Sequence, residues 1–514
     1  MTALAEGFTG LALAAGLAML CARQLRGAFI CFAAQSTFVA AVAILAGQPL
    51  LALPPAASVA AVRLLRSRTP IPRDGRRIAG IAAGAVLALL SLSEGDAGIP
   101  LAVVLPAIVL AAIRRDPVTR LLALGAVGNG IVLAGCLLGA DDLLPLACLL
   151  LPLPMAASLA GLAPGLVETG RRWARRGSAA WLGWAELAGA AALFAASLIV
   201  PLGALASVFA PLIAFDGVVR ASIARSGRPV RPWRRVASLL QLGFVLLAVC
   251  ASDPMLSWLA VTAAATAALA ATAARHPDRA LLASIGAGLA LFGTLTLPIE
   301  PSLAGYLGLF SGYAMLAASV PDLAIPLLVL LLRSAVQTEW LPGAGPIGIG
   351  VALTALLACS ALLIRGRRDR ADILLLAQGG IAGLAIALSQ PDGRFAAAAL
   401  LILLSLTRTA SRAANQPAAL LSIAGLAGLP PIGVFPGLVL AVLAIGSHAP
   451  WLLLPLGLAL MPVLLAGLPR RLPPISLRAF HSVAWLPLAL ATLFGLFAPM
   501  ELVRWLAAVT MGPS

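Results

Sequence analysis

Residues 417–446 read PAALLSIAGLAGLPPIGVFPGLVLAVLAIG, a run without a single charged residue. An apolar run of about 20 residues is long enough to cross the hydrocarbon core of a bilayer as a helix. The pair Pro430-Pro431 lies near the middle of the run, and its two residues lack the N–H donors that a continuous helix needs. Freed backbone groups are tolerated at that depth only inside protein or beside a watery cavity. The stretch therefore predicts a broken helix inside a membrane bundle.

The rest of the chain has the same apolar character. Hydrophobic residues make up 61% of its 514 residues and charged residues 11%, whereas soluble domains are nearer half and a quarter. The apolar runs are too long and too continuous for the alternating pattern of a membrane β-barrel. We therefore predict an all-α, polytopic membrane protein of about 20 transmembrane helices, with the broken helix near 417–446.

Every one of the 35 basic residues is an arginine, and the chain has no lysine. The arginines gather in polar breaks at every second turn between apolar runs, and the other turns carry mostly acidic residues. Only Arg333, Arg394 and Arg504 depart from this alternation, and the break near Asp322 is the one predicted inside turn without an arginine. Because basic loops stay on the cytoplasmic side, we expect a bacterial cytoplasmic (inner) membrane protein with both termini outside the cytoplasm.

The formal net charge of +16 is also typical of nucleic-acid-binding proteins. Here the arginines lie at the ends of apolar spans, where the positive-inside rule accounts for them, so we expect no nucleic-acid partner. The six cysteines lie in apolar runs without metal-site or disulfide spacing. We therefore expect no metal and no cofactor in this chain, and the lipid bilayer as its surroundings.

The most polar predicted inside break covers residues 166–178 and contains four arginines. We interpret it as a basic cytoplasmic linker between two membrane domains. The first, residues 1–165, has about seven predicted helices, and the second, residues 179–514, has about thirteen. The loops are short throughout, so the sequence leaves no room for a large soluble domain.

The first domain carries the stretch from Arg114 to Ile131, RRDPVTRLLALGAVGNGI. It resembles component E of hydrogenase-4, a relative of the small membrane subunits of respiratory complex I, in which the stretch ends in Glu-Asn-Gly-Ile. One position departs from that pattern, because the family's intramembrane glutamate is Gly128 here.

The second domain carries the segment from Leu421 to Phe435, which contains a motif of four residues: Pro430, Pro431, Gly433 and Phe435. It resembles the broken helix of the antiporter-like subunits shared by complex I, Mrp antiporters and membrane-bound hydrogenases. The Pro-Pro-x-Gly-x-Phe form of the hydrogenase-4 and formate hydrogenlyase branch (component F-like) fits best. The two resemblances imply a component E-like half fused to an antiporter-like half.

In that family, the resemblance implies a proton relay of lysine, glutamate and histidine side chains. A buried lysine can release a proton because burial lowers its pKa, whereas an arginine stays protonated. The charged position of the family's broken helix is Leu438 here, and the central helix carries Arg408 and Arg412 in place of histidine and lysine. A lysine relay is therefore impossible in this chain.

Three residues stay as candidates for a proton path: Glu186, Asp216 and Arg408. Glu186 is either an intramembrane carboxylate or an interfacial one beside the arginines of the linker. Asp216 lies one helical turn before Arg220, so an ion pair accounts for both, and we expect Arg408 to snorkel to the inside interface. The sequence allows no continuous line of titratable groups to be traced across either half.

These observations predict a membrane subunit of a complex I-like or group 4 hydrogenase-like redox complex. It would be a scaffold or anchor with a degenerate proton path and no catalytic centre. The resemblance implies membrane and peripheral subunits as partners, with iron–sulfur or nickel–iron centres on those subunits only and a quinone site on a neighbour. Two alternatives stay open. One is an active proton- or sodium-translocating subunit, which requires Glu186 to lie in the middle of the bundle and to face a polar cavity, and the other is a stand-alone secondary transporter.

Overall fold

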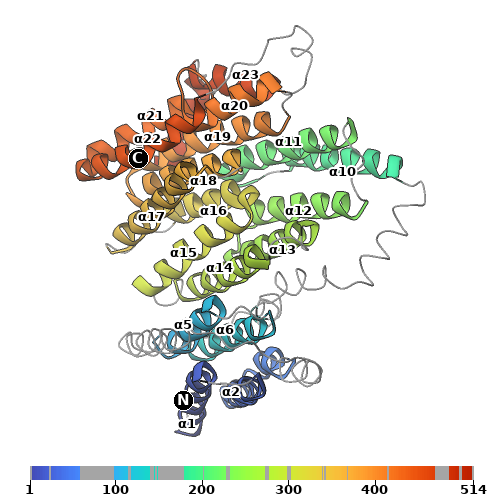
Figure 1. The fold of residues 1–514 in the computed structure, drawn as a ribbon, viewed down its shortest axis with the longest axis vertical. Helices are drawn as coiled ribbons and strands as arrows, with labels where there is room; N and C mark the ends of the chain where they lie inside the picture. The colour runs from blue at the N-terminus through green and yellow to red at the C-terminus, as the bar shows by residue number, and fades with distance from the viewer. Residues whose placement is uncertain are drawn as a thin grey trace. The chain divides into compact units, whose positions relative to one another are not determined.

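The computed structural model describes residues 3–21, 25–57, 98–113, 117–138, 144, 148, 179–200, 202–226, 232–272, 277–297, 302–337, 340, 343–366, 369–413, 416–468, 485–496 and 500–511. Every regular element in these ranges is a helix (Figure 1), which confirms the all-α class. Eight of the helices are long and apolar enough to cross a membrane, and other apolar helices are shorter. The helices support a membrane protein, and the total of about 20 spans stays a prediction.

The chain divides into two units, residues 1–166 with 253–315 and residues 167–252 with 316–514. The first division falls at the start of the predicted linker 166–178, which lies outside the described residues, as does the predicted span 79–93. The segment 253–315 lies in the predicted second domain, but in the structure it belongs to the same unit as the N-terminal residues. The reason is a long-range contact: α14 (Pro277–Thr296) packs on α6 (Pro117–Leu138), where Arg120 pairs with Asp278 at 3.1 Å.

The first unit consists of apolar helices, which hydrogen-bond to one another through a few buried polar groups. Asn129 of α6 donates to the Ser36 hydroxyl of α2 at 2.9 Å, and the Trp258 indole of α13 donates to the Ala287 carbonyl of α14 at 2.8 Å. Such bonds hold helices together where water is absent. The unit's remaining elements are α1 (Ala3–Cys21), α2 (Leu25–Leu45), η1 (Pro49–Ala52), α5 (Gly98–Ile113), α13 (Pro254–Thr272) and most of α15 (Leu303–Ser319).

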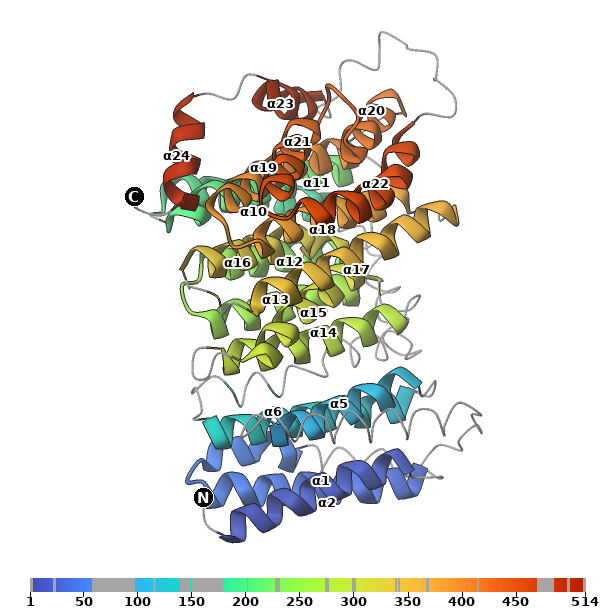
Figure 2. The same cartoon turned by 90° about the vertical axis from the view of Figure 1, so that its left-hand side faces the viewer.

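The second unit is centred on two neighbouring helices, α18 (Arg370–Ala387) and α19 (Pro391–Ala413). Almost every side chain of α18 from residue 373 onward is buried. Around them lie α10 (Ala179–Ile199), α11 (Ala204–Ser226), α12 (Pro232–Cys250), η3 (Pro321–Leu323), α16 (Ala324–Gln337), α17 (Ala344–Ile364), α20 (Gln416–Ala427), α21 (Phe435–His448), η4 (Pro450–Leu452), α22 (Leu453–Gly467), α23 (Trp485–Leu496) and α24 (Met500–Met511). In Figure 2, α19 lies beside α21 and α23, which it contacts.

One predicted span is two helices. The sequence favours a single helix over 482–506, but α23 ends at Leu496 and α24 begins at Met500. Pro499, directly before α24, has no N–H to donate to the preceding turn, which is typical of a helix start.

The predicted break within 417–446 is confirmed, since α20 ends at Ala427 and α21 begins at Phe435. Gly428 has a φ of 84°, and its N–H bonds to the Gly425 carbonyl at 3.1 Å. The next N–H, of Leu429, bonds back to the Ala424 carbonyl at 3.1 Å. This pair of bonds around a left-handed glycine is the Schellman motif that ends many helices.

Gly433 has the tightest backbone contact in the break. Its φ is 67°, and a Cβ at this position would lie 2.7 Å from the Gly425 Cα. The N–H of Val434 then bonds to the Gly425 carbonyl at 3.2 Å and leads into α21 at Phe435. Only glycine permits both the left-handed conformation and this close approach.

Two of the arginines that depart from the alternation bind the ends of helices. Arg333 of α16 donates to the carbonyl of Val249 at 3.3 Å and to that of Ala251, at the end of α12. Arg394 donates to the Ser389 carbonyl at 3.2 Å, just after α18. A cation is favourable at the negative end of a helix dipole, so these charges have a local structural role.

We expect Gly433→Ala to lower the free energy of unfolding by about 1–3 kcal/mol, because a side chain in a left-handed conformation is strained. Gly457→Ala in α22 is the matched control, since a Cβ there meets nothing within 4 Å. Thermal unfolding in mild detergent compares the two. Equal midpoints for both variants would contradict the described geometry of the break.

Candidate functional site

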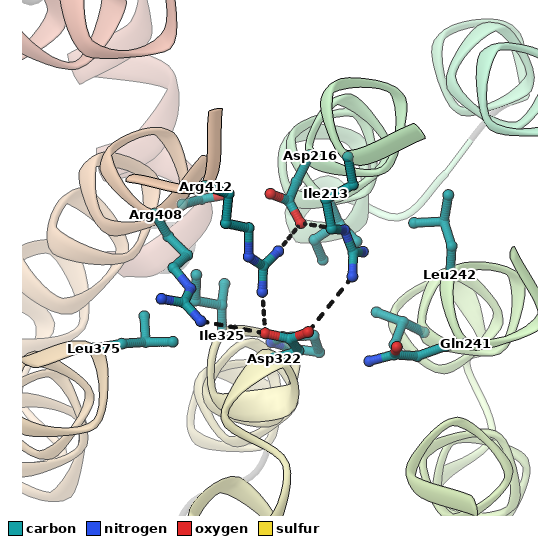
Figure 3. Close-up of a pocket in the computed structure, with 13 residues that line it drawn as sticks. Ile213, Asp216, Gln241, Leu242, Asp322, Ile325, Leu375, Arg408 and Arg412 are labelled. Carbon is teal, nitrogen blue, oxygen red and sulfur yellow. Dashed lines mark hydrogen bonds and ion pairs between the residues drawn. The ribbon is translucent and has the colours of Figure 1, made fainter. Parts of the chain in front are cut away.

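A closed ring of four charged side chains lies in the second unit (Figure 3). Arg220 of α11 pairs with Asp216 at 3.1 Å and with Asp322 of η3 at 3.5 Å. Arg412 of α19 pairs with the same two carboxylates. Each arginine thus bridges both aspartates, and we call these four residues the ion-pair ring.

Arg408 extends the ion-pair ring to a third carboxylate. Its guanidinium lies 3.5 Å from Asp322 and contacts Asp372 of α18. The Thr409 hydroxyl also donates to Asp216, at 3.1 Å. The extended cluster therefore holds three arginines and three aspartates, and its formal charge is zero.

The sequence places four of these six charges at helix ends that favour them. Asp322 lies in the turn directly before α16, and Asp372 lies in the first turn of α18. Arg408 and Arg412, four residues apart, lie near the end of α19. Acids at helix starts and bases at helix ends both interact favourably with the helix dipole. Packing of the helices then brings these separate charges together.

Asp322 is the most highly connected carboxylate of the cluster. Burial by itself raises the pKa of its carboxyl, but the charges of Arg412, Arg220 and Arg408 outweigh it and hold the pKa below its usual value. The ionised form of Asp322 is therefore the one that the fold stabilises.

A second ion pair lies beside the ion-pair ring. Glu186 of α10 pairs with Arg235 of α12 at 3.1 Å, and the two side chains are only 7% and 8% exposed. Glu186 also lines a cavity of about 10 Å³ together with Arg220 and Ser238. It thus faces a partly polar cavity, as the translocating alternative requires.

The ion-pair ring itself lines a larger cavity of about 30 Å³, with Arg408, Gln241 and Ser405 among the other lining residues. This is room for one or two water molecules, since one water needs roughly 10–15 Å³ by this measure. Arg220 and Leu242 line both cavities. Figure 3 shows Gln241 opposite the arginines of α19, on the far side of Asp322.

The structure gives new surroundings to all three candidate residues. Asp216 has the predicted pair with Arg220, but it also binds Arg412 and Thr409. The partner of Glu186 is Arg235, and the linker arginines lie outside the described residues. Arg408 does not snorkel away from the protein, because its side chain is 10% exposed and lies between two aspartates.

The prediction that no line of titratable groups crosses either half stays a prediction, although the described charges do form a local line. Charged side chains follow one another from Glu186 past Arg220 and Asp322 to Arg408 and Asp372. All of them lie near those helix ends that the arginine pattern predicts to be cytoplasmic. The line therefore runs along one end of the helices rather than from one end to the other.

Chemically, the cluster holds charge in place rather than passing it on. Its cations are arginines, which stay protonated, and the chain has no lysine that could take their place. In the part of the chain that the structure describes, no group of histidine, cysteine, aspartate and glutamate residues has the arrangement of a metal site.

No family model matches the chain, and no curated protein or solved structure matches it either. The likeness to hydrogenase-4-type subunits stands on the two quoted stretches. In the structure, the stretch that ends at Ile131 lies largely in α6, and the stretch that ends at Phe435 forms the break between α20 and α21.

We expect Arg412→Gln to lower the free energy of unfolding by about 1–3 kcal/mol, because it leaves two partly buried carboxylates, Asp216 and Asp322, with one cation fewer. Adding Asp216→Asn restores the neutrality of the ion-pair ring and should recover part of the loss. Denaturant unfolding of the wild type, both single variants and the double variant gives the coupling energy. Strictly additive effects would show that the two residues do not interact.

Stability should also fall in acid because of Asp322. The pKa of Asp322 is lower in the folded chain than in the unfolded chain, where it is about 3.9. Asp322 therefore contributes fully to the free energy of unfolding above about pH 3.9, and this contribution is lost as the pH falls through the lower pKa of the folded chain. We expect Asp322→Asn to flatten the acid limb of the unfolding midpoint against pH. Asp392→Asn, at a carboxylate that is 66% exposed, is the control and should keep the wild-type profile.

Proposed function

We propose that this chain is a membrane-embedded scaffold subunit of a complex I-like or group 4 hydrogenase-like redox assembly, without a proton relay of its own. The observation that carries the proposal is the ion-pair ring. Each of its carboxylates is engaged by two arginines, and an arginine cannot load and unload a proton as a buried lysine can. Such a cluster fixes helices to one another and keeps its charges where they are.

The helix break supports the family part of the proposal. It has the Pro-Pro-x-Gly-x-Phe motif and forms two helices around a turn. The position at which the family has lysine or glutamate is Leu438, which is buried and fills the space beside Gly428. A broken helix that resembles the one of the antiporter-like subunits is thus combined with an apolar side chain beside the break.

The outer faces of the second unit suit lipid or other membrane subunits. Large apolar side chains are exposed along α22, among them Leu454, Leu458 and Met461. By the resemblance, the partners would hold the iron–sulfur or nickel–iron centres, and a quinone would bind at a neighbouring subunit. By the arginine pattern, the chain would lie in a bacterial cytoplasmic membrane with both termini outside.

One observation favours the alternative of an active proton-translocating subunit. Glu186 lines a cavity that shares Arg220 with the cavity of the ion-pair ring. In this alternative, water in the two cavities would carry a proton between Glu186 and Asp216. Both carboxylates would then have to leave their arginine partners during each cycle, which is the costly step for buried ion pairs.

The assembly is tested by purifying the tagged chain in mild detergent and identifying bound proteins by mass spectrometry. We expect redox subunits of the hydrogenase or quinone-reductase type in a fixed ratio to this chain. A chain that purifies alone and well folded would overturn the scaffold proposal and favour a stand-alone transporter.

A measurement of proton uptake distinguishes the proposed scaffold function from the alternative of proton translocation. With Glu186→Gln or Asp216→Asn in the intact complex, the scaffold predicts unchanged proton uptake by membrane vesicles during turnover. Asp392→Asn is the control for an unrelated carboxylate, and the subunit ratio confirms that each variant assembles. Loss of proton uptake in the first two variants alone would establish the alternative.

A further inference from the structure

Gln378 is a buried polar side chain that takes no part in the ion pairs and the ion-pair ring described above. It lies in the middle of α18, is fully buried, and is flanked by buried apolar residues. Among the residues that the structure describes, neither its amide oxygen nor its amide nitrogen has a hydrogen-bond partner. An amide in such a place is strongly unfavourable unless something binds it.

The backbone of the helix break has two matching acceptors. In a continuous helix, the carbonyls of Leu426 and Ala427 would accept bonds from the N–H groups of residues 430 and 431. Both of those residues are proline, which has no N–H. The Schellman bonds at Gly428 and Leu429 go to earlier carbonyls, so they leave these two acceptors to other donors.

The amide and the break meet at Gly428. The amide nitrogen of Gln378 lies 3.4 Å from the position that a Cβ on Gly428 would take. Leu438 reaches the same position from α21 and lies 2.6 Å from it. Gln378 therefore points at the backbone where α20 ends, and Leu438 closes the far side.

We propose that the break between α20 and α21 binds a buried water molecule, held by the Gln378 amide and the carbonyl oxygens of Leu426 and Ala427. Water can accept from the amide nitrogen and donate to two carbonyls, so it satisfies groups of both kinds. A cation could bind the oxygens only and would leave the amide N–H groups unpaired. The assignment requires the amide nitrogen of Gln378 to face the break, as it does in the structure, because a water that donates to two carbonyls has no third hydrogen for an amide oxygen.

This water site is separate from the proposed assembly. It depends on three residues of this chain and on the two prolines, whatever partners the chain has. No ionisable side chain contributes to it, since the family's charged position is Leu438. The bound water is therefore a structural part of the break, and it makes a backbone interruption tolerable inside apolar surroundings.

Radiolytic hydroxyl labelling with mass spectrometry tests the proposal, because X-ray pulses oxidise buried side chains that lie beside bound water. The full-length protein in detergent is compared with its Gln378→Met variant, which keeps the side-chain length and removes the amide. We expect Leu438 to be labelled in the wild type far above Leu404, a fully buried leucine of α19, and to fall to the level of Leu404 in the variant. Labelling of Leu438 no higher than that of Leu404 in the wild type would overturn the proposal without any variant.

The thermal unfolding midpoint of Gln378→Met is a second test, which also applies if the substitution weakens the fold. If water satisfies the amide, Gln378→Met removes hydrogen bonds and its thermal midpoint falls below that of the wild type. If the amide is buried without a ligand, the same substitution removes an unfavourable group, and the midpoint rises. A raised midpoint, or labelling of Leu438 that persists in Gln378→Met and Gln378→Leu alike, contradicts the water site.

Discussion

A carboxylate in apolar surroundings needs a cation, and in a chain without lysine that cation is arginine. Asp322 meets three arginines, and two of them also bind Asp216. The ion-pair ring joins α11 and α19 to the turn that starts α16, and Arg408 adds α18. Removing any member leaves partly buried charges of the opposite sign with one partner fewer, so the members stabilise one another. The arrangement of the second unit depends on this mutual stabilisation.

The two polar features of the second unit differ in kind. The ion-pair ring is charged, balanced and placed near helix ends. The break between α20 and α21 is uncharged and lies between apolar helices, with Leu438 and Gln378 beside Gly428. A proton path would need titratable groups at both places and between them. The described residues have them only at the first, which is why a scaffold role fits the geometry better than transport.

The features that the sequence predicts are local ones. Run length and composition indicate membrane helices, and two adjacent prolines end a helix whatever surrounds them. The pair of Asp216 and Arg220 is also local, since the two residues are one turn apart.

The features that the sequence does not predict are long-range contacts. Arg412 binds Asp216 from 196 residues away and Asp322 from 90 residues away, and no spacing rule connects such positions. The same limit explains two of the interpretations that the structure changes. Arg408 at a helix end resembles a snorkelling residue until α18 and η3 are packed beside it. The segment 253–315 changes unit because of the contact between α14 and α6. The lack of an arginine in the turn of Asp322 was the available signal, because a partly buried acid without a cation in its own turn is stabilised by a distant one.

The carboxylates of the ion-pair ring stay ionised because the arginines around them fix their charge. Infrared spectroscopy of protein with isotope-labelled aspartate, titrated across the physiological pH range in detergent, measures this directly. The account predicts a constant carboxylate band from Asp216 and Asp322, assigned by its loss in Asp216→Asn and Asp322→Asn. A protonated carboxyl band that appears within this range and is removed by either substitution would contradict the account, since it would show a ring member that takes up a proton.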